Sequence, residues 1–293
     1  MSTSQRPIVL GVDESAGTEA ALQWALDEAR TRNAPVHLLC AYRWGLPYRW
    51  DAMYANVGDP ELRHIQRSAE DLVARTVAAA NRIASDVEVT GEAVDGNAAQ
   101  ALVDASSDAA LVVLGSRHLK ALGSALLGSV GAGVAARGAC PVVVVRGPAG
   151  LTAEQAAVVV GVDGTDAAEP ALEFGFDHAR RHRVPLRAVL CWRPDLLASM
   201  QWRPEPPAPA RAEAWLSEAL AGWREKYPDV QTDAAVVRDH PIAGLVAEST
   251  AQHLLVVRSR TRYALAGTLL GSVSQGVLHH ATCPVAVIPA AAN

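Results

Sequence analysis

The chain has 293 residues, half of them hydrophobic, so it has the length and apolar content to form about two domains with packed cores. Its 26 basic and 31 acidic residues give a net charge of −5, and the basic side chains are scattered, which argues against nucleic-acid binding. No apolar run is long enough to cross a bilayer, and residues 1–7 carry no apolar signal segment, so we expect a cytoplasmic protein that does not bind membranes.

The first elements are predicted to be a strand, a helix and a second strand. Residues 8–13 form an apolar run that ends in Gly11-Val12-Asp13, and Thr18 then has the position of a helix N-cap. Apolar residues at helical spacing follow, and a second strand is predicted at residues 36–41. The same order returns with an offset of 150 residues: a strand at 158–163, a helix, and a strand at 186–191.

An irregular stretch rich in Trp, Tyr or Pro follows in each copy, at residues 42–60 and 192–210. Such a stretch is consistent with a lid over a ligand and equally with an ordinary ordered surface loop. After it, each copy is predicted to form a long helix, a strand and a shorter helix: 61–84, 87–94 and 98–106 in the first copy, and 212–227, 230–237 and 242–250 in the second.

A candidate binding site follows the fourth predicted strand. That strand, at residues 109–114, runs into Gly115-Ser116-Arg117-His118, and Gly128-Ser129-Val130 follows after a gap of nine residues. Glycines let backbone N–H groups approach phosphate oxygens, and a helix that starts near Ser129, with the Ser129 hydroxyl as its cap, would point its N-terminus at them. An ordinary connection between a strand and a helix explains the same residues, so the motif alone leaves both interpretations open.

The same motif recurs near the C-terminus with an offset of 143 residues. Arg258-Ser259-Arg260-Thr261 follows an apolar run, and Gly271-Ser272-Val273 comes after a gap of nine residues. Each copy then ends in Cys-Pro and a short apolar strand, at residues 142–145 and 285–288. The chain is therefore an internal duplication.

We divide the duplication into two domains, residues 1–148 and residues 149–293. Strands and helices alternate in each, which predicts an α/β fold with a parallel sheet and helices on both faces. Ligands in such sheets bind outside the carboxyl ends of the strands, where Asp13 would meet residues 115–129.

Three features together resemble the universal stress protein family in its tandem bacterial form. They are Gly-Val-Asp after the first strand, the glycine pattern after the fourth, and Cys-Pro-Val before the fifth, in order in both copies. The resemblance implies two tandem doubly wound domains, each with a five-stranded parallel sheet of strand order 3-2-1-4-5, and ATP binding as in many members. It also implies that domains pair through their fifth strands, so we expect residues 142–145 and 285–288 to pair within the chain, and the chain to form a homodimer.

The resemblance places the ATP contacts of the family at equivalent positions in the two copies. In the first copy they are Gly11, Val12, Asp13, Ala41, Gly115, Arg117, His118, Gly128, Ser129 and Val130. In the second copy they are Gly161, Val162, Asp163, Cys191, Arg258, Arg260, Thr261, Gly271, Ser272 and Val273. His118 replaces one glycine of the motif, whereas Arg258 and Thr261 replace both early glycines of the second copy. We therefore expect a nucleotide site in the first copy and weaker binding in the second, because the Arg258 side chain would keep the backbone from the phosphates.

The sequence contains no pattern typical of a catalytic site. A Ser/His/Asp order that fits a triad, a Gly-Lys-Ser/Thr P-loop and a His-Glu-x-x-His motif are all absent. The expected function is a non-catalytic regulator that senses ATP and has unidentified protein partners, with Asp13 positioning a magnesium ion beside ATP. The alternatives are a nucleotide-independent scaffold with degenerate sites and, with less support, a slow ATPase.

No metal centre is predicted from the protein's own side chains. His178 and His182 have the spacing of two metal ligands on one helix face, but no acidic residue or third histidine accompanies them in the sequence. They are interpreted as a surface or half-buried pair, and His279-His280 likewise. The four cysteines lack CxxC spacing, which argues against zinc binding and dithiol chemistry.

Overall fold

The structure is a computed structural model that describes residues 5–43, 60–118, 125–126, 128–146, 156–192, 209–259 and 270–290. The two irregular stretches expected after the second strand of each copy lie, apart from their ends, outside these residues. The expected domain boundary after residue 148 also lies outside them and stays a prediction.

Strands and helices alternate along each half of the chain, as the duplication predicts. The first half contains β1 (Ile8–Gly11), α1 (Gly17–Arg32), β2 (Val36–Tyr42), α2 (Pro60–Ile83), β3 (Val89–Asp95), α3 (Ala98–Ala105), β4 (Leu111–Gly115), β5 (Arg117–His118), β6 (Ala125–Leu126), α4 (Ser129–Arg137) and β7 (Val142–Val145). The second half contains β8 (Val158–Val162), the 3-10 helix η1 (Asp166–Ala168), α5 (Glu169–His182), β9 (Leu186–Cys191), α6 (Pro209–Lys226), β10 (Thr232–Val237), α7 (Pro241–Glu248), β11 (Leu254–Arg258), α8 (Ser272–His280) and β12 (Val285–Ile288). None of the described helices has the length and apolar character needed to cross a membrane.

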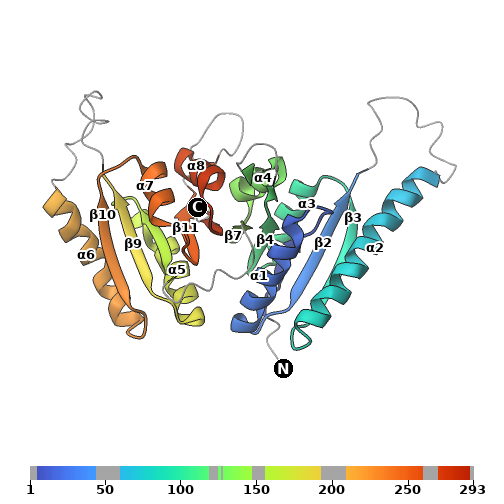
Figure 1. Cartoon of the computed structure of the whole chain (residues 1–293), viewed down its shortest axis with the longest axis horizontal. Helices are drawn as coiled ribbons and strands as arrows, with labels where there is room; N and C mark the ends of the chain where they lie inside the picture. Colours follow the sequence, from blue (N-terminus) through green and yellow to red (C-terminus); the bar gives the residue numbers. More distant parts are fainter. Residues whose placement is uncertain are drawn as a thin grey trace.

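One continuous sheet of ten strands runs through both halves, in the order β3-β2-β1-β4-β7-β12-β11-β8-β9-β10. Within each half the neighbouring strands are parallel and follow the order 3-2-1-4-5, which confirms the predicted fold class. In Figure 1 the halves stand side by side, with α2 and α6 at the two outer ends. From the first strand of each half, the next strands are added toward one edge of the sheet and the later strands toward the other. This switch point lies between β1 and β4 in the first half and between β8 and β11 in the second.

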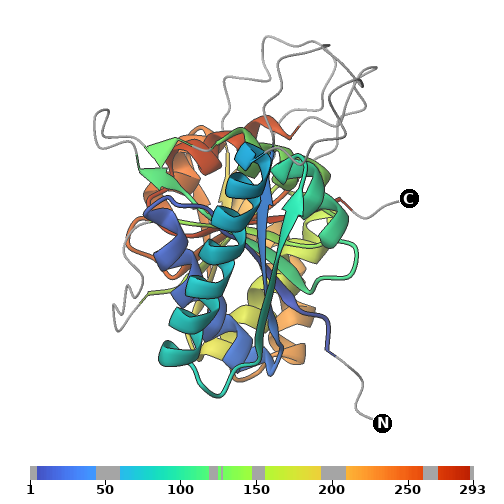
Figure 2. The ribbon, with the colours of Figure 1, turned by 90° about the vertical axis from the view of Figure 1, so that its right-hand side faces the viewer.

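Helices cover both faces of the sheet, and the apolar core forms two layers. Buried residues of α1, α2, α5 and α6 belong to one layer, and those of α3, α4, α7 and α8 to the other. Figure 2, viewed from the β3 side, shows α2 and α1 together on one face. Along β1, Ile8 and Leu10 contribute to the first layer and Val9 to the second, because side chains of a strand alternate between faces. Each layer contains residues of both halves, so the core is continuous across the chain.

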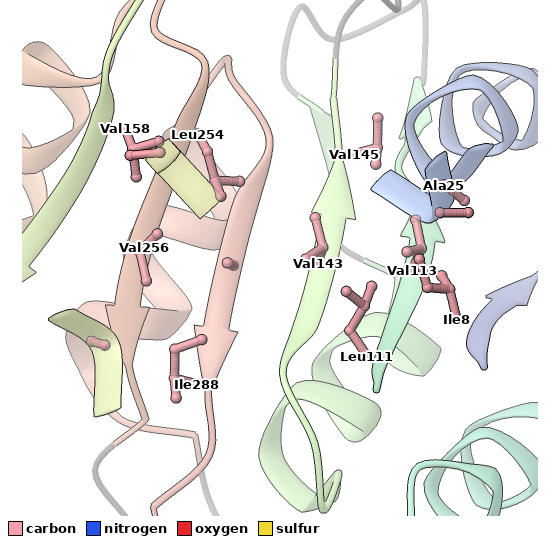
Figure 3. Packing of buried hydrophobic residues seen from close by; sticks show 14 of the residues in the cluster. Ile8, Ala25, Leu111, Val113, Val143, Val145, Val158, Leu254, Val256 and Ile288 are labelled. Carbon is pink, nitrogen blue, oxygen red and sulfur yellow. The ribbon is translucent and has the colours of Figure 1, made fainter. Parts of the chain in front are cut away.

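An antiparallel ladder between β7 and β12 joins the two halves. The paired residues are Val142 with Val287, Val143 with Ala286, and Val144 with Val285, all of them buried. Figure 3 shows apolar side chains on the two sides of this junction, with Val143 and Val145 from β7 and Ile288 from β12. The predicted pairing of the two fifth strands within the chain is confirmed, and each covers the edge that the other would expose.

The halves also meet outside the sheet. A short antiparallel hairpin, in which β5 pairs with β6, lies between β4 and α4 of the first half. This hairpin contacts α8 of the second half, and α1 contacts α5. The first contact lies beside the glycine motif, and the second lies on the helical layer that contains α1 and α5.

Helices α1 and α5 both end at a residue with a left-handed backbone, Asn33 with φ of 51° and Arg183 with φ of 55°. Both residues are exposed. Asparagine tolerates this conformation better than arginine does. We expect Arg183→Asn to raise the free energy of unfolding by about 0.5–1 kcal/mol in urea denaturation. The reverse change, Asn33→Arg, should lower it by a similar amount, and two unchanged values would contradict the assignment of strain to residue 183.

Candidate functional site

Each half has a pocket at the carboxyl ends of its strands, beside the switch point. The first pocket has a volume of about 230 Å³ and lies between the ends of β1, β2 and β4 and the first residues of α3 and α4. The second, of about 240 Å³, occupies the same place in the other half. The predicted residues that line the first pocket are Gly11, Val12, Asp13, Ala41, Gly115, Gly128, Ser129 and Val130. Those that line the second are Gly161, Val162, Asp163, Cys191, Arg258, Gly271, Ser272 and Val273.

The remaining predicted residues are not placed at the pockets. Arg260 and Thr261 lie outside the described residues, and so do the side chains of Arg117 and His118. The backbone of His118 belongs to β5 and pairs with Ala125, so it is extended. The left-handed conformation that would favour glycine at position 118 is therefore not used.

Asp13 closes the turn that leads from β1 into α1. Its Oδ1 atom accepts hydrogen bonds from the Ser15 backbone N–H at 3.0 Å and from the Thr18 hydroxyl at 3.1 Å. The expected N-cap role of Thr18 is wrong, because α1 begins at Gly17 and the Thr18 hydroxyl also bonds the Asp13 backbone. Asp163 repeats the turn through the N–H and hydroxyl of Thr165. Both aspartates thus shape their loops as well as lining their pockets.

The N-terminus of a helix opens into each pocket. Helix α4 begins at Ser129 and its N-cap is Gly128, with no side-chain hydrogen bond to the cap. The expected capping role of the Ser129 hydroxyl is therefore wrong. The second half repeats the arrangement with Gly271 before α8. Uncapped N–H groups at a helix N-terminus attract anions, because they carry the positive end of the helix dipole.

Gly115 allows the first turn of α1 to pack directly on the end of β4. A Cβ atom at position 115 would meet the backbone carbonyl of Gly17 at 2.4 Å. In the second half Arg258 and Ala167 take the equivalent positions, and α5 begins only at Glu169, after the single turn of η1. Arg258 lines the second pocket without filling it, and its buried Nε atom has no hydrogen-bond partner among the described residues.

Several lining residues were missed by the sequence analysis. Ser116 lines the first pocket and is 3% exposed, and its buried hydroxyl has no hydrogen-bond partner in the described part of the chain. Ala98 and Leu102 of α3 form an apolar wall, for which no motif offered a signal. Ser116 stood inside the recognised motif, so its position between Gly115 and Arg117 was an available signal.

The Cys191 thiol gives the second pocket a different wall from that of the first. It takes the place of Ala41, and burial raises its pKa to about 11, with Asp239 and Glu248 adding to the effect. A thiol with this pKa is neutral at physiological pH and acts as a small apolar wall. The two pockets therefore share their frame, and the differences between them include Cys191 in place of Ala41 and Arg258 in place of Gly115.

Two doubly wound halves, each with a pocket at the switch point and a glycine-capped helix beside it, define a tandem α/β protein with paired ligand pockets. A model of the Universal stress protein family matches residues 5–146 and again residues 156–289. The chain therefore belongs to the universal stress protein family, which confirms the predicted resemblance.

Similar proteins have the same tandem organisation over nearly their whole length. The chain is 36% identical over 293 residues to a universal stress protein of Mycobacterium bovis, covering 97% of each chain. It is 35% identical over 304 residues to a universal stress protein of Mycolicibacterium smegmatis, covering 98% of each. A solved universal stress protein from Archaeoglobus fulgidus matches with a TM-score of 0.70 and 17% identity, over 98% of this chain and 97% of that one. That structural likeness concerns the fold.

Proposed function

We propose that the protein binds ATP in the first pocket and acts as a non-catalytic, nucleotide-sensing regulator in the bacterial stress response. The observation that carries the proposal is the uncapped N-terminus of α4, where Gly128, Ser129 and Val130 line the same pocket as Asp13. Such a helix end stabilises phosphate groups through its N–H donors and its dipole. The apolar wall beside it suits a nucleobase.

The proposed pose follows from the chemistry of the lining. Phosphates lie at Gly128 and Ser129, where backbone donors are available. The base and ribose lie against Val12 and Ala41. The Asp13 carboxylate is the pocket residue that would bind the Mg²⁺ ion accompanying ATP. The buried Ser116 hydroxyl offers a further hydrogen bond to the ligand.

A regulator needs a binding equilibrium, not a chemical step. Among the described residues that line the first pocket, no histidine or second carboxylate accompanies Asp13 to act as a general acid or base.

We propose that the protein works in the cytoplasm, as a homodimer, through protein partners that distinguish its free and bound forms. Because β7 and β12 already cover each other within one chain, the homodimer forms through another surface.

Gly128→Ala is expected to weaken ATP binding about 10–100-fold without lowering the melting temperature, because a misplaced phosphate loses charge-assisted hydrogen bonds of roughly 1.5–3 kcal/mol each. A Cβ atom at Gly128 meets nothing within 4 Å in the protein, and φ of −63° suits alanine, so the methyl group occupies only the space proposed for phosphate. Calorimetric titration with ATP and Mg²⁺ measures the loss.

Gly271→Ala is the matched variant in the second half, where we propose that Arg258 makes nucleotide binding weaker. It should therefore change the total heat of ATP binding less than Gly128→Ala does. Equal losses in the two variants would contradict the asymmetry between the halves. A wild-type protein that binds no ATP would contradict the proposed function and leave a scaffold role for the duplicated fold.

A further inference from the structure

Three histidines of the second half lie close together on the side of the sheet that α5 covers. His178 and His182 lie one turn apart on α5, and His253 belongs to the segment before β11. Their ring centroids are 4.2, 5.1 and 5.0 Å apart, and one ring nitrogen from each lies within 4.8 Å of the others. The interpretation of His178 and His182 as a surface or half-buried pair is wrong for His178, which is fully buried, and the fold adds His253 from a distant part of the sequence.

Local structure explains why His253 reaches the other two. Its backbone N–H donates to the carbonyl of Ala157, directly before β8, at 3.0 Å. Helix α5 packs on β8 and β11, so it presents His178 and His182 to the start of both strands. Trp24 of α1 and Phe174 of α5 stack against His178, with centroids 6.0 and 6.1 Å away, and fix its ring.

A carboxylate from the first half completes the cluster. Glu28 of α1 is fully buried, and its Oε2 atom lies 2.7 Å from Nε2 of His182 and 3.2 Å from Nδ1 of His178. Its Oε1 atom accepts from Nε of Arg32 at 2.5 Å. Burial alone raises the pKa of Glu28, but His178, His182 and Arg32 outweigh it and hold the pKa well below its usual value. Three nitrogen-bearing side chains therefore surround this one carboxylate.

The orientation of this carboxylate leaves ring nitrogens available on the other side. With Glu28 at Nδ1 of His178 and Nε2 of His182, the opposite nitrogen of each ring is directed away from the carboxylate. Both ring nitrogens of His178 and the Nε2 atom of His253 are buried and make no hydrogen bond to the described residues, so Nδ1 of His178 contacts Glu28 at 3.2 Å as an ion pair without hydrogen-bond geometry. Burial lowers the pKa of both His178 and His253. Buried imidazole nitrogens that lack a hydrogen-bond partner in the described part of the chain are candidates to bind a metal ion.

We propose that His178, His182 and His253 bind a divalent first-row transition-metal ion, preferably Zn²⁺, with Glu28 as the carboxylate that orients two of the three ligands. Three imidazoles and one water make a common tetrahedral zinc site, and ligating histidines generally hydrogen-bond a carboxylate through their other nitrogen. Zn–N bonds of about 2.0–2.1 Å place the nitrogens about 3.4 Å apart. The rings of His178 and His182 are stacked at an interplanar angle of 29°, so their side chains must rotate for both lone pairs to converge on one ion.

The site has a consequence for the arrangement of the halves. Its ligands come from the second half, whereas the carboxylate that positions them comes from α1 of the first. Arg181 of α5 also donates to the backbone carbonyl of Thr31 at 3.1 Å, beside the cluster. Metal binding would therefore stabilise the contact between α1 and α5, independently of any ligand in the two pockets.

Titration of the metal-free full chain with Co²⁺, followed by competition with Zn²⁺, tests the proposal. The wild type should bind a single tight equivalent of Co²⁺ with the strong visible bands of tetrahedral coordination, and Zn²⁺ should displace it and raise the melting temperature. His253→Ala should abolish the bands, and Glu28→Gln should keep them while weakening affinity about 10–100-fold. His64→Ala, at an exposed position on α2, is the matched control and should behave as the wild type.

Two results of the Co²⁺ titration would contradict a metal site at these three histidines. Wild-type bands that are absent, or that persist unchanged in His253→Ala, would overturn the proposal. Bands lost in a His279→Ala/His280→Ala double variant and kept in His253→Ala would assign the ion to the end of α8 and also overturn it. If circular dichroism shows that His253→Ala does not fold, His182→Ala replaces it, because the His182 side chain is 15% exposed and easier to truncate.

Discussion

Replacing Glu28 with alanine is expected to lower the free energy of unfolding by about 3–5 kcal/mol, because the change breaks a buried ionic network and leaves its other members in place. The carboxylate is fully buried and contacts Arg32, His178 and His182. Without it, the largely buried Arg32 guanidinium loses its anion, and α1 loses its polar contacts with the α5 histidines. Urea denaturation in the presence of a chelator measures this loss without any contribution from metal.

Two further variants separate charge from packing. Glu28→Gln keeps the shape of the side chain and removes the charge, so it should cost less than Glu28→Ala and still destabilise. Asp86→Ala removes the partner of Arg30 in an exposed ion pair, and its effect should be much smaller because solvent screens that pair. Equal losses for Glu28→Ala and Asp86→Ala would show that the buried network contributes no more than a surface pair.

Gly115→Ala is expected to lower the free energy of unfolding by about 3 kcal/mol. The added Cβ atom would meet the carbonyl oxygen of Gly17 at 2.4 Å, and backbone atoms cannot move aside as a flexible side chain can. Either α1 retreats from the end of β4 or the strand shifts, and both changes disturb the buried layer beneath α1. Thermal and urea denaturation of the variant measure the loss.

Gly128→Ala is the control for Gly115→Ala, since the same substitution there meets nothing within 4 Å. It should leave stability unchanged while weakening ATP binding. An unchanged stability for Gly115→Ala would mean that α1 can begin later, as α5 does at Glu169 after η1. In that case the close packing of Gly17 on β4 would be a local preference and not a requirement of the fold.

Much of the fold could be predicted because its signals are periodic and repeated. The helix expected at residues 61–84 is α2, Pro60–Ile83, and its long amphipathic pattern is visible without any partner. The pairing of residues 142–145 with residues 285–288 could be predicted from their apolar sequences, because short apolar edge strands are unfavourable unless another strand covers them. The hairpin β5–β6 was missed, since strands of two residues have no detectable periodicity.

The sites were harder to predict, because their details depend on contacts distant in sequence. The glycine motif located the pockets, but Gly128 and not Ser129 is the helix cap, and Gly115 faces Gly17. The histidine cluster escaped detection for the same reason: Glu28 is 154 residues from His182. Residue spacing identifies neighbours on one helix, whereas only the folded chain brings separate elements together.

The contact between hairpin β5–β6 and α8 joins the loop beside the first pocket to the helix that begins at the second. The hairpin lies between Gly115 and Gly128, which line the first pocket, and α8 follows Gly271, which lines the second. A ligand that altered the free energy of this contact from one side would alter the affinity at the other, and the coupling factor would be the same in both directions. If both pockets bind a ligand as proposed, we expect the binding isotherm of the whole chain to require two dissociation constants and one cooperativity constant.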